Sequence, residues 1–99
     1  MMGDSLTLSA FQKHIRDRYY ATDAARGSAK TFVWFIEEVG ELATALNGEA
    51  ASEENRANLR EEFADVFAWL LTLANIQGVD LQKAIDRKYF KDGGPQGHK

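Results

Sequence analysis

FVWFIEEVGEL at residues 32–42 and EEFADVFAWLL at residues 61–71 determine how this chain folds. Each segment joins a run of consecutive apolar residues to the pattern acid-acid-x-x-acid. Consecutive apolar residues cover every side of a helix, and such a helix is typically buried on every side. Both segments therefore predict helices that pack against other elements, with acidic side chains interrupting their apolar surface.

Apolar residues at three- and four-residue spacing extend the helical pattern outward from these segments. Residues 22–29 are interpreted as a linker, and Asn47-Gly48 ends the second helix because both residues tolerate left-handed backbone geometry. Candidate N-cap residues precede three of the helices: Ser28, Ser52 and Asp80. The resulting prediction is an all-α chain with helices at about residues 7–21, 29–47, 53–76 and 81–91 and an irregular tail at 92–99.

The length of 99 residues corresponds to one domain, spanning residues 1–99. A domain of this size buries only a modest core. A four-helix monomer cannot easily cover two segments that are apolar on every side. We therefore expect a four-helix, bundle-like fold completed by homo-oligomerisation, as a homodimer or a homotetramer.

The net charge of −3 is unevenly distributed along the chain. Residues 31–79 contain nine acids and two bases, whereas each end of the chain carries more bases than acids. An acidic centre disfavours binding to nucleic acid, whose backbone requires clustered Lys and Arg. It suits divalent cations, which prefer oxygen ligands.

Cysteine is absent, which excludes disulfides and thiolate metal sites. No run of residues approaches the roughly 20 apolar residues of a membrane span. The first residues lack the basic and apolar segments of a secretory signal. We therefore expect a cytoplasmic protein without a membrane-spanning segment.

The acids of the two segments share helix faces. Each helical residue advances by about 100°, so Glu38 and Glu41 lie about 60° apart and one turn from each other. Glu62 and Asp65 have the same spacing. If the two pairs face each other, they form an all-oxygen site of four carboxylates, which favours Mg²⁺ or Mn²⁺ over Zn²⁺. The alternative is a solvated acidic surface, and both interpretations stay open at this point.

A di-iron carboxylate site is the nearest alternative metal centre. It requires Glu-x-x-His on facing helices. The two histidines, His14 and His98, do not follow a glutamate by three residues. The sequence therefore favours magnesium over iron.

The stretch from Glu37 to Asp65, with its continuation to Leu71, resembles the MazG family of nucleotide pyrophosphohydrolases. The family's mark is Glu-Glu-x-x-Glu followed by Glu-x-x-Asp, and the resemblance extends over about residues 30–91. It implies an all-α bundle, dimeric or tetrameric. It also implies hydrolysis of a nucleoside triphosphate, NTP or dNTP, to a monophosphate and pyrophosphate with Mg²⁺.

The resemblance assigns roles to individual residues as well. It implies four metal ligands, which are Glu38, Glu41, Glu62 and Asp65. Glu37, the first residue of the motif, is a further catalytic candidate, either as a ligand or as the base that orients water. Two residues near the end of the chain, Lys88 and Lys91, are candidates for binding phosphates.

Two tryptophans flank the acidic motifs. Trp34 precedes Glu38 by four residues, so it shares that helix face and is a candidate for stacking on a nucleobase. Trp69 follows Asp65 by four residues, and packing in the core or at a subunit interface is the competing interpretation of both rings.

A second function also stays open. The apolar segments alone fit a non-catalytic helical oligomerisation or regulatory module, in which the acids only decorate the surface.

Overall fold

The structure, a computed structural model, describes residues 6–48 and 53–91. Within these ranges the chain is helical and contains no strand. The helices are α1 (Leu8–Arg26), α2 (Ser28–Leu46), α3 (Glu53–Ile76) and α4 (Leu81–Ile85), and α4 continues into the wider π-helical turn η1 (Asp86–Phe90). The predicted all-α class is confirmed. The predicted cap Ser52 and the predicted irregular tail at 92–99 lie outside the described residues.

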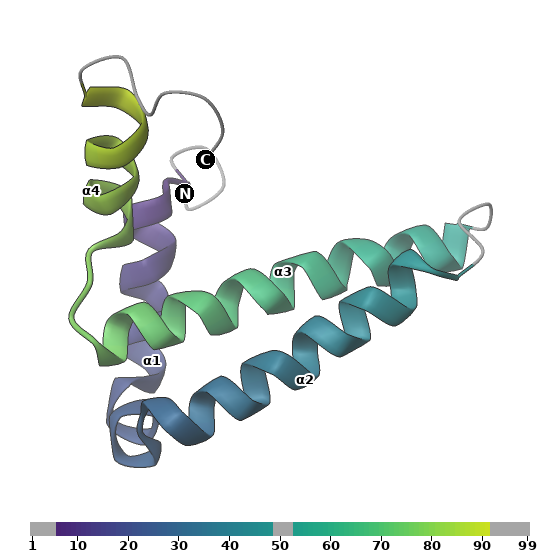
Figure 1. Cartoon of the computed structure of the whole chain (residues 1–99), viewed down its shortest axis with the longest axis horizontal. Coiled ribbons are helices and arrows are strands. Elements are labelled where there is room, and N and C mark those ends of the chain that lie inside the picture. The colour runs from purple at the N-terminus through teal and green to yellow at the C-terminus, as the bar shows by residue number, and fades with distance from the viewer. Residues whose placement is uncertain (1–5, 49–52, 92–99) are drawn as a thin grey trace.

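The helices α2 and α3 lie side by side as a long antiparallel hairpin (Figure 1). α1 crosses the end of the hairpin where α2 begins and α3 ends, and α4 lies beside the first half of α1. The radius of gyration is 15.6 Å. A compact chain of this length would have a radius of about 13 Å. One chain is therefore more open than a closed four-helix bundle.

The predicted linker at residues 22–29 is wrong. Residues 22–26 continue α1, and Gly27 alone separates α1 from α2. Gly27 has a φ of +84°, which residues with a Cβ rarely adopt. The stretch before it is rich in alanine and ends in arginine, and these good helix formers outweigh the turn preference of the polar residues beside them.

The other helix ends follow the sequence signals in part. Asp80 caps α4 as predicted, since its Oδ1 accepts a hydrogen bond of 3.0 Å from an N–H of the first turn. The N-cap of α2 is Gly27, and the Ser28 hydroxyl instead accepts a hydrogen bond of 2.6 Å from the side chain of Gln77. α2 ends at Asn47 as predicted, although Asn47 does not use the left-handed geometry that it tolerates, since its φ is −95° and its ψ is 2°.

Few side chains are buried within one chain. Ile15 and Leu71 are the only buried hydrophobic residues among those described. Gln12 and Asn75 are buried amides that bond to each other at 3.0 Å, and Gln12 also donates to the Val79 carbonyl at 2.7 Å. These bonds join α1 to the last turn of α3 and to the segment that follows it, which gives Asn75 a structural role.

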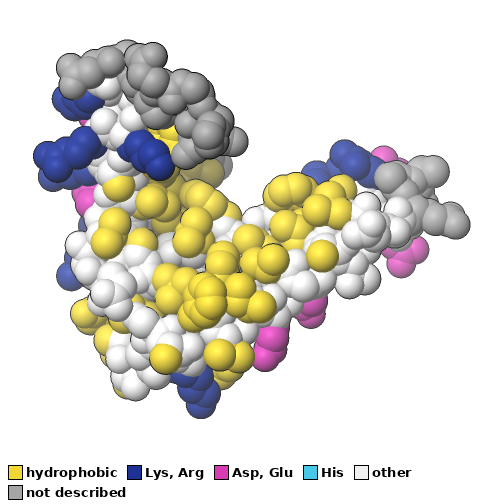
Figure 2. All heavy atoms as spheres, in the orientation of Figure 1, with side chains coloured by type: hydrophobic (Ala, Val, Ile, Leu, Met, Phe, Trp, Pro, Cys, Tyr) yellow, Lys and Arg dark blue, Asp and Glu magenta, His cyan; other side chains and the backbone are white. Residues whose placement is uncertain are grey.

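Large apolar side chains remain exposed along the hairpin. They recur at helical spacing on both of its helices, as Phe32, Val33 and Ile36 on α2 and Phe63, Phe67 and Leu70 on α3. Figure 2 shows apolar surface along the hairpin and in the angle that it makes with α1 and α4. No helix in the described ranges combines the length and hydrophobicity needed to cross a bilayer. Contiguous exposed apolar surface of this kind usually marks a site of association.

Candidate metal centre

The carboxylates of the two motifs meet on the hairpin. Because α2 and α3 are antiparallel and in contact, the acids in the second half of α2 lie beside those in the first half of α3. Glu38, Glu41 and Glu62 each place one carboxylate oxygen within 4.8 Å of the other two. The structure thus brings three of the predicted site residues together, and we refer to them as the carboxylate cluster.

Asp65 and Glu37 are placed differently relative to this cluster. Asp65 is exposed, but its charge acts on both Glu38 and Glu62. Glu37 is also exposed, and it is not among the groups whose charges act on those two carboxyls. The structure therefore places Asp65 close to the carboxylate cluster and leaves Glu37 on the exposed surface of α2.

Burial and mutual repulsion change the protonation of the carboxylate cluster. Removal from water, a side-chain hydrogen bond with Glu41 and the charges of the neighbouring acids raise the pKa of Glu38 from 4.5 to about 7. Burial also raises the pKa of Glu62, and the charges of Glu41 and Asp65 add to this effect. The cluster consequently holds its negative charge poorly unless a positive charge joins it.

Glu62 indicates most clearly that a cation would fit. Its Oε2 atom is buried, and no described residue forms a hydrogen bond with it. A buried charged oxygen without a partner is costly, so such atoms usually have a cation, a donor or a water beside them. All donors of the cluster are carboxylate oxygens, which suit hard divalent ions such as Mg²⁺ and Mn²⁺. The residues present therefore fit the predicted metal.

The raised pKa values predict that the stability of the metal-free protein falls as the pH rises, whereas the stabilisation by Mg²⁺ grows. Without metal, folded Glu38 keeps its proton up to about pH 7, whereas an unfolded glutamate loses it near pH 4.5. The free energy of unfolding should therefore fall as the pH rises through this window. Mg²⁺ competes with the same protons, so the increase in Tm that Mg²⁺ produces should grow from pH 6 to pH 8. Thermal melts with and without Mg²⁺ measure both trends, and a Mg²⁺-induced shift that shrinks towards pH 8 would contradict the prediction.

A hollow of about 410 Å³ adjoins the carboxylate cluster on the side of the hairpin tip. Glu41 and Glu62 line it together with polar residues that include Thr44, Asn55 and Asn58. Pockets for small molecules have volumes of about 300–1,000 Å³. A larger hollow of about 570 Å³ lies between α1 and residues 75–80, away from the cluster. We consider the smaller one relevant to the site because it reaches the carboxylates.

An aromatic pair lies on the other side of the carboxylate cluster, towards α1. The rings of Trp34 on α2 and Trp69 on α3 meet edge to face, with centroids 5.7 Å apart and planes at 83°. The guanidinium carbon of Arg26 lies 4.6 Å from the Trp34 centroid and 5.3 Å from the Trp69 centroid. Trp34 remains 37% exposed. Part of this ring is therefore open to a ligand.

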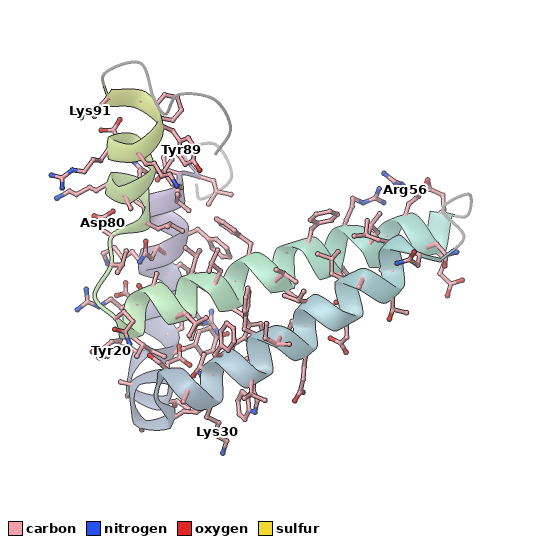
Figure 3. All side chains as sticks on the ribbon, in the orientation of Figure 1. Tyr20, Lys30, Arg56, Asp80, Tyr89 and Lys91 are labelled. Carbon is pink, nitrogen blue, oxygen red and sulfur yellow. The ribbon has the colours of Figure 1, made fainter. Side chains whose placement is uncertain are left out.

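The predicted phosphate-binding residues lie apart from the carboxylates of their own chain. Lys88 belongs to η1 and Lys91 follows it, on an arm in which α4 packs against α1. Figure 3 shows Lys91 at the free end of this arm, and Figure 2 shows basic side chains gathered there. Lys88 Nζ lies 5.4 Å from the centre of the Tyr89 ring, and Lys91 pairs with Asp86 at 3.7 Å. Within one chain, the structure does not bring either lysine to the carboxylate cluster.

Two residues beside the tryptophans were not singled out from the sequence. Asp23 and Arg26 fell in the predicted linker at 22–29, where no helical contact was expected. Their separation of three residues is typical of an acid-base pair on one helix face, and this spacing is the sequence signal that could have predicted the pair. Recognition of this pair would also have extended the predicted first helix to Arg26.

Comparison with known families agrees with this geometry. The sequence matches the MazG nucleotide pyrophosphohydrolase domain over residues 26–91. This range starts at the last residue of α1 and includes α2, α3, α4 and η1, and with them the carboxylate cluster and Asp65. A comparison with curated proteins found no match. Because the matched domain covers well over half of the 99 residues, the chain belongs to the MazG nucleotide pyrophosphohydrolase family.

Proposed function

We propose that the protein hydrolyses nucleoside triphosphates, NTP or dNTP, to a monophosphate and pyrophosphate with Mg²⁺ as cofactor. The carboxylate cluster is the observation that carries this proposal. Its three oxygens lie within 4.8 Å of one another, and a buried oxygen of Glu62 has no bonding partner among the described residues. Partial removal from water and the neighbouring acids, Glu41 first among them, raise the pKa of Glu38 to about 7, which supports a site that favours a bound cation. Family membership supports the reaction class, and the cluster offers a place for the metal.

The residues that would hold Mg²⁺ are Glu38, Glu41, Glu62 and Asp65, and the same oxygen ligands suit Mn²⁺. When bound, the ion supplies positive charge against the triphosphate oxygens and lowers the pKa of water. We assign the proton of the attacking water to the carboxylate of Glu41, because this residue belongs to the carboxylate cluster and its side chain is exposed. Phosphoryl transfer depends mainly on positioning and charge neutralisation, so a covalent nucleophile is not required. Trp34 offers a ring face on which the base can stack.

We further propose that the active protein is a homodimer or homotetramer whose subunits meet through the apolar surface of the hairpin. One chain buries only Ile15 and Leu71 as hydrophobic residues in its described part, so a second copy would complete the core. A neighbouring subunit would also bring its own Lys88 and Lys91 to the phosphates, since within one chain these lysines lie apart from the carboxylate cluster. The proposed setting is the cytoplasmic nucleotide pool.

A non-catalytic oligomerisation module is the second candidate function, and the exposed apolar residues of the hairpin favour it. In that case the acids would be surface decoration, and Mg²⁺ with a nucleotide would leave the Tm unchanged. Thermal melts with and without these ligands separate the two functions.

Incubation of the purified protein with Mg²⁺ and a panel of canonical and modified ribo- and deoxyribonucleoside triphosphates tests the proposed reaction. We expect at least one of them to yield monophosphate and pyrophosphate in equal amounts, and chelation with EDTA to stop the reaction. Release of a diphosphate with inorganic phosphate would show cleavage of the wrong anhydride bond. Failure of the whole panel in protein that binds Mg²⁺ would reject the proposal.

A further inference from the structure

A buried ion pair connects the end of α1 to the two tryptophans. Arg26 Nη2 donates to Asp23 Oδ1 at 2.6 Å, and the two side chains are only 9% and 8% exposed. Arg26 Nε donates to the hydroxyl of Thr31 at 2.8 Å, and Thr31 is fully buried. The guanidinium is therefore fixed at two points, one on α1 and one on α2.

The free-energy cost of burying this ion pair argues against a purely stabilising role. Burial of two charges often destabilises a protein relative to apolar residues of similar volume. Asp23 Oδ2 is also buried, and no described residue bonds to it. The protein therefore keeps an energetically costly buried ion pair, although it buries very few apolar side chains.

The ion pair ends on an aromatic platform, which we define as Trp34 and Trp69. The guanidinium of Arg26 lies within cation–π distance of both rings, at 4.6 Å and 5.3 Å from their centroids. Lys30 Nζ also approaches Trp34, at 5.6 Å, but this side chain is exposed. Arg26 is thus the cation of the platform that hydrogen bonds hold in place, whereas Lys30 is an exposed cation near the same ring.

The platform stands one helical turn from the carboxylates. Trp34 is four residues from Glu38, and Trp69 is four residues from Asp65. Four residues correspond to about 6 Å along a helix axis. A nucleotide whose phosphates lie at the carboxylate cluster can therefore place its base on this side. A tryptophan ring that is already fixed binds the nucleobase more tightly, because the side chain loses less conformational freedom on binding.

We infer that Asp23 and Arg26 are positioning residues for the nucleobase. Asp23 fixes Arg26, and Arg26 fixes the aromatic platform on which the base stacks. This inference rests on the proposed function, since the base belongs to the same triphosphate. The pair acts on the binding of the nucleotide and leaves the hydrolytic step unchanged.

Arg26→Lys and Asp23→Asn test this inference in the full chain. Lysine keeps the charge but loses the planar fork that bonds Asp23 and stacks on the rings. Stacking of one base on an aromatic residue accounts for about 1–3 kcal/mol, so we expect the KM for nucleoside triphosphates to rise about fivefold or more. The kcat should stay within about twofold of the wild-type value, because the lost interaction stabilises the bound substrate and the transition state equally. Thr31→Val removes only the second anchor of Arg26 and should raise the KM less.

Asp17→Asn is the matched control for Asp23→Asn. Asp17 lies on the same helix and pairs with Lys13 at 2.7 Å, but both side chains are exposed. This substitution should leave the KM and the kcat unchanged. A rise in KM equal to that of Asp23→Asn would overturn the inference.

The chain contains only two tryptophans, so its tryptophan signals report on the platform alone. Rings in edge-to-face contact at 5.7 Å should give an exciton couplet in circular dichroism. We expect Arg26→Lys to weaken this couplet without loss of the far-ultraviolet helical signal. An unchanged couplet together with an unchanged KM would overturn the inference.

Inorganic tripolyphosphate serves as a ligand without a base. Its inhibition constant should be the same for the wild type and the Arg26 and Asp23 variants, and equal weakening would show that Arg26 binds phosphates instead. If the wild type hydrolyses no triphosphate, the proposed function fails separately. In that case the couplet still tests the role of the pair, together with a titration of the tryptophan fluorescence with α,β-methylene triphosphates. Weaker binding of these analogues by the Arg26→Lys and Asp23→Asn variants would support the inference, and equal binding by the wild type and both variants would overturn it.

Discussion

Glu38→Gln is expected to abolish hydrolysis and, at the same time, to raise the Tm of the metal-free protein at pH 8. Glutamine keeps the shape of the side chain but removes a charge that burial and neighbouring acids disfavour, as the pKa of about 7 shows. It also removes a proposed metal ligand. Loss of even an outer-shell partner of a metal costs about 10–100-fold in affinity or activity, so kcat/KM should fall at least about a hundredfold. Hydrolysis of the best substrate and metal-free thermal melts measure the two effects.

Glu54→Gln is the matched control for this substitution. Glu54 is an exposed acid in the first turn of α3 and lies outside the carboxylate cluster. Its replacement should change neither activity nor Tm appreciably, whereas Glu62→Gln should behave like Glu38→Gln. Full activity in the Glu38 variant would refute the site assignment. A lower metal-free Tm at pH 8 would refute the proposed repulsion within the cluster.

Val33→Glu is expected to dissociate the proposed oligomer into single chains. Val33 is 56% exposed on the hairpin, where we place the subunit interface. Truncation of an interface hot spot costs at least about 2 kcal/mol, and an unpaired buried charge costs more, so the dissociation constant should rise at least about thirtyfold. Light scattering after size exclusion measures the mass. The Tm should fall as well, because the stability of an oligomer includes its association.

Val79→Glu introduces the same side chain at an exposed valine outside the hairpin. This control should keep the mass and the Tm of the wild type. A wild-type protein that elutes as a single chain, or a Val33 variant that keeps its oligomeric mass, would contradict the proposed interface.

The acidic motifs could be predicted from the sequence because the information that defines them is local. The helical period alone puts Glu38 one turn from Glu41, and α3 spans Glu53–Ile76 as expected. Whether the two motifs face each other depends on how α2 and α3 pair. The contact of Glu62 with the two acids of α2 is therefore a result of the structure, and it turns a pattern of charges into a candidate site.

Other features depend on contacts between distant residues. Arg26 could not be assigned to the tryptophans because Trp69 lies more than 40 residues away in the chain. The distance of Lys88 from the carboxylates could not be predicted from the sequence either. It results from the turn between α3 and α4 and from the packing of α4 on α1. Local patterns placed the helices, and tertiary packing decided which side chains share a site.

Titration of Mn²⁺ into the metal-free protein, followed by the electron paramagnetic resonance signal of free Mn²⁺, tests most directly whether Glu38, Glu41 and Glu62 hold a divalent ion. We expect saturable binding that Mg²⁺ displaces and that Glu38→Gln and Glu62→Gln each weaken at least about tenfold. Equal binding by the wild type and both variants, or no binding by the wild type, would contradict the central claim.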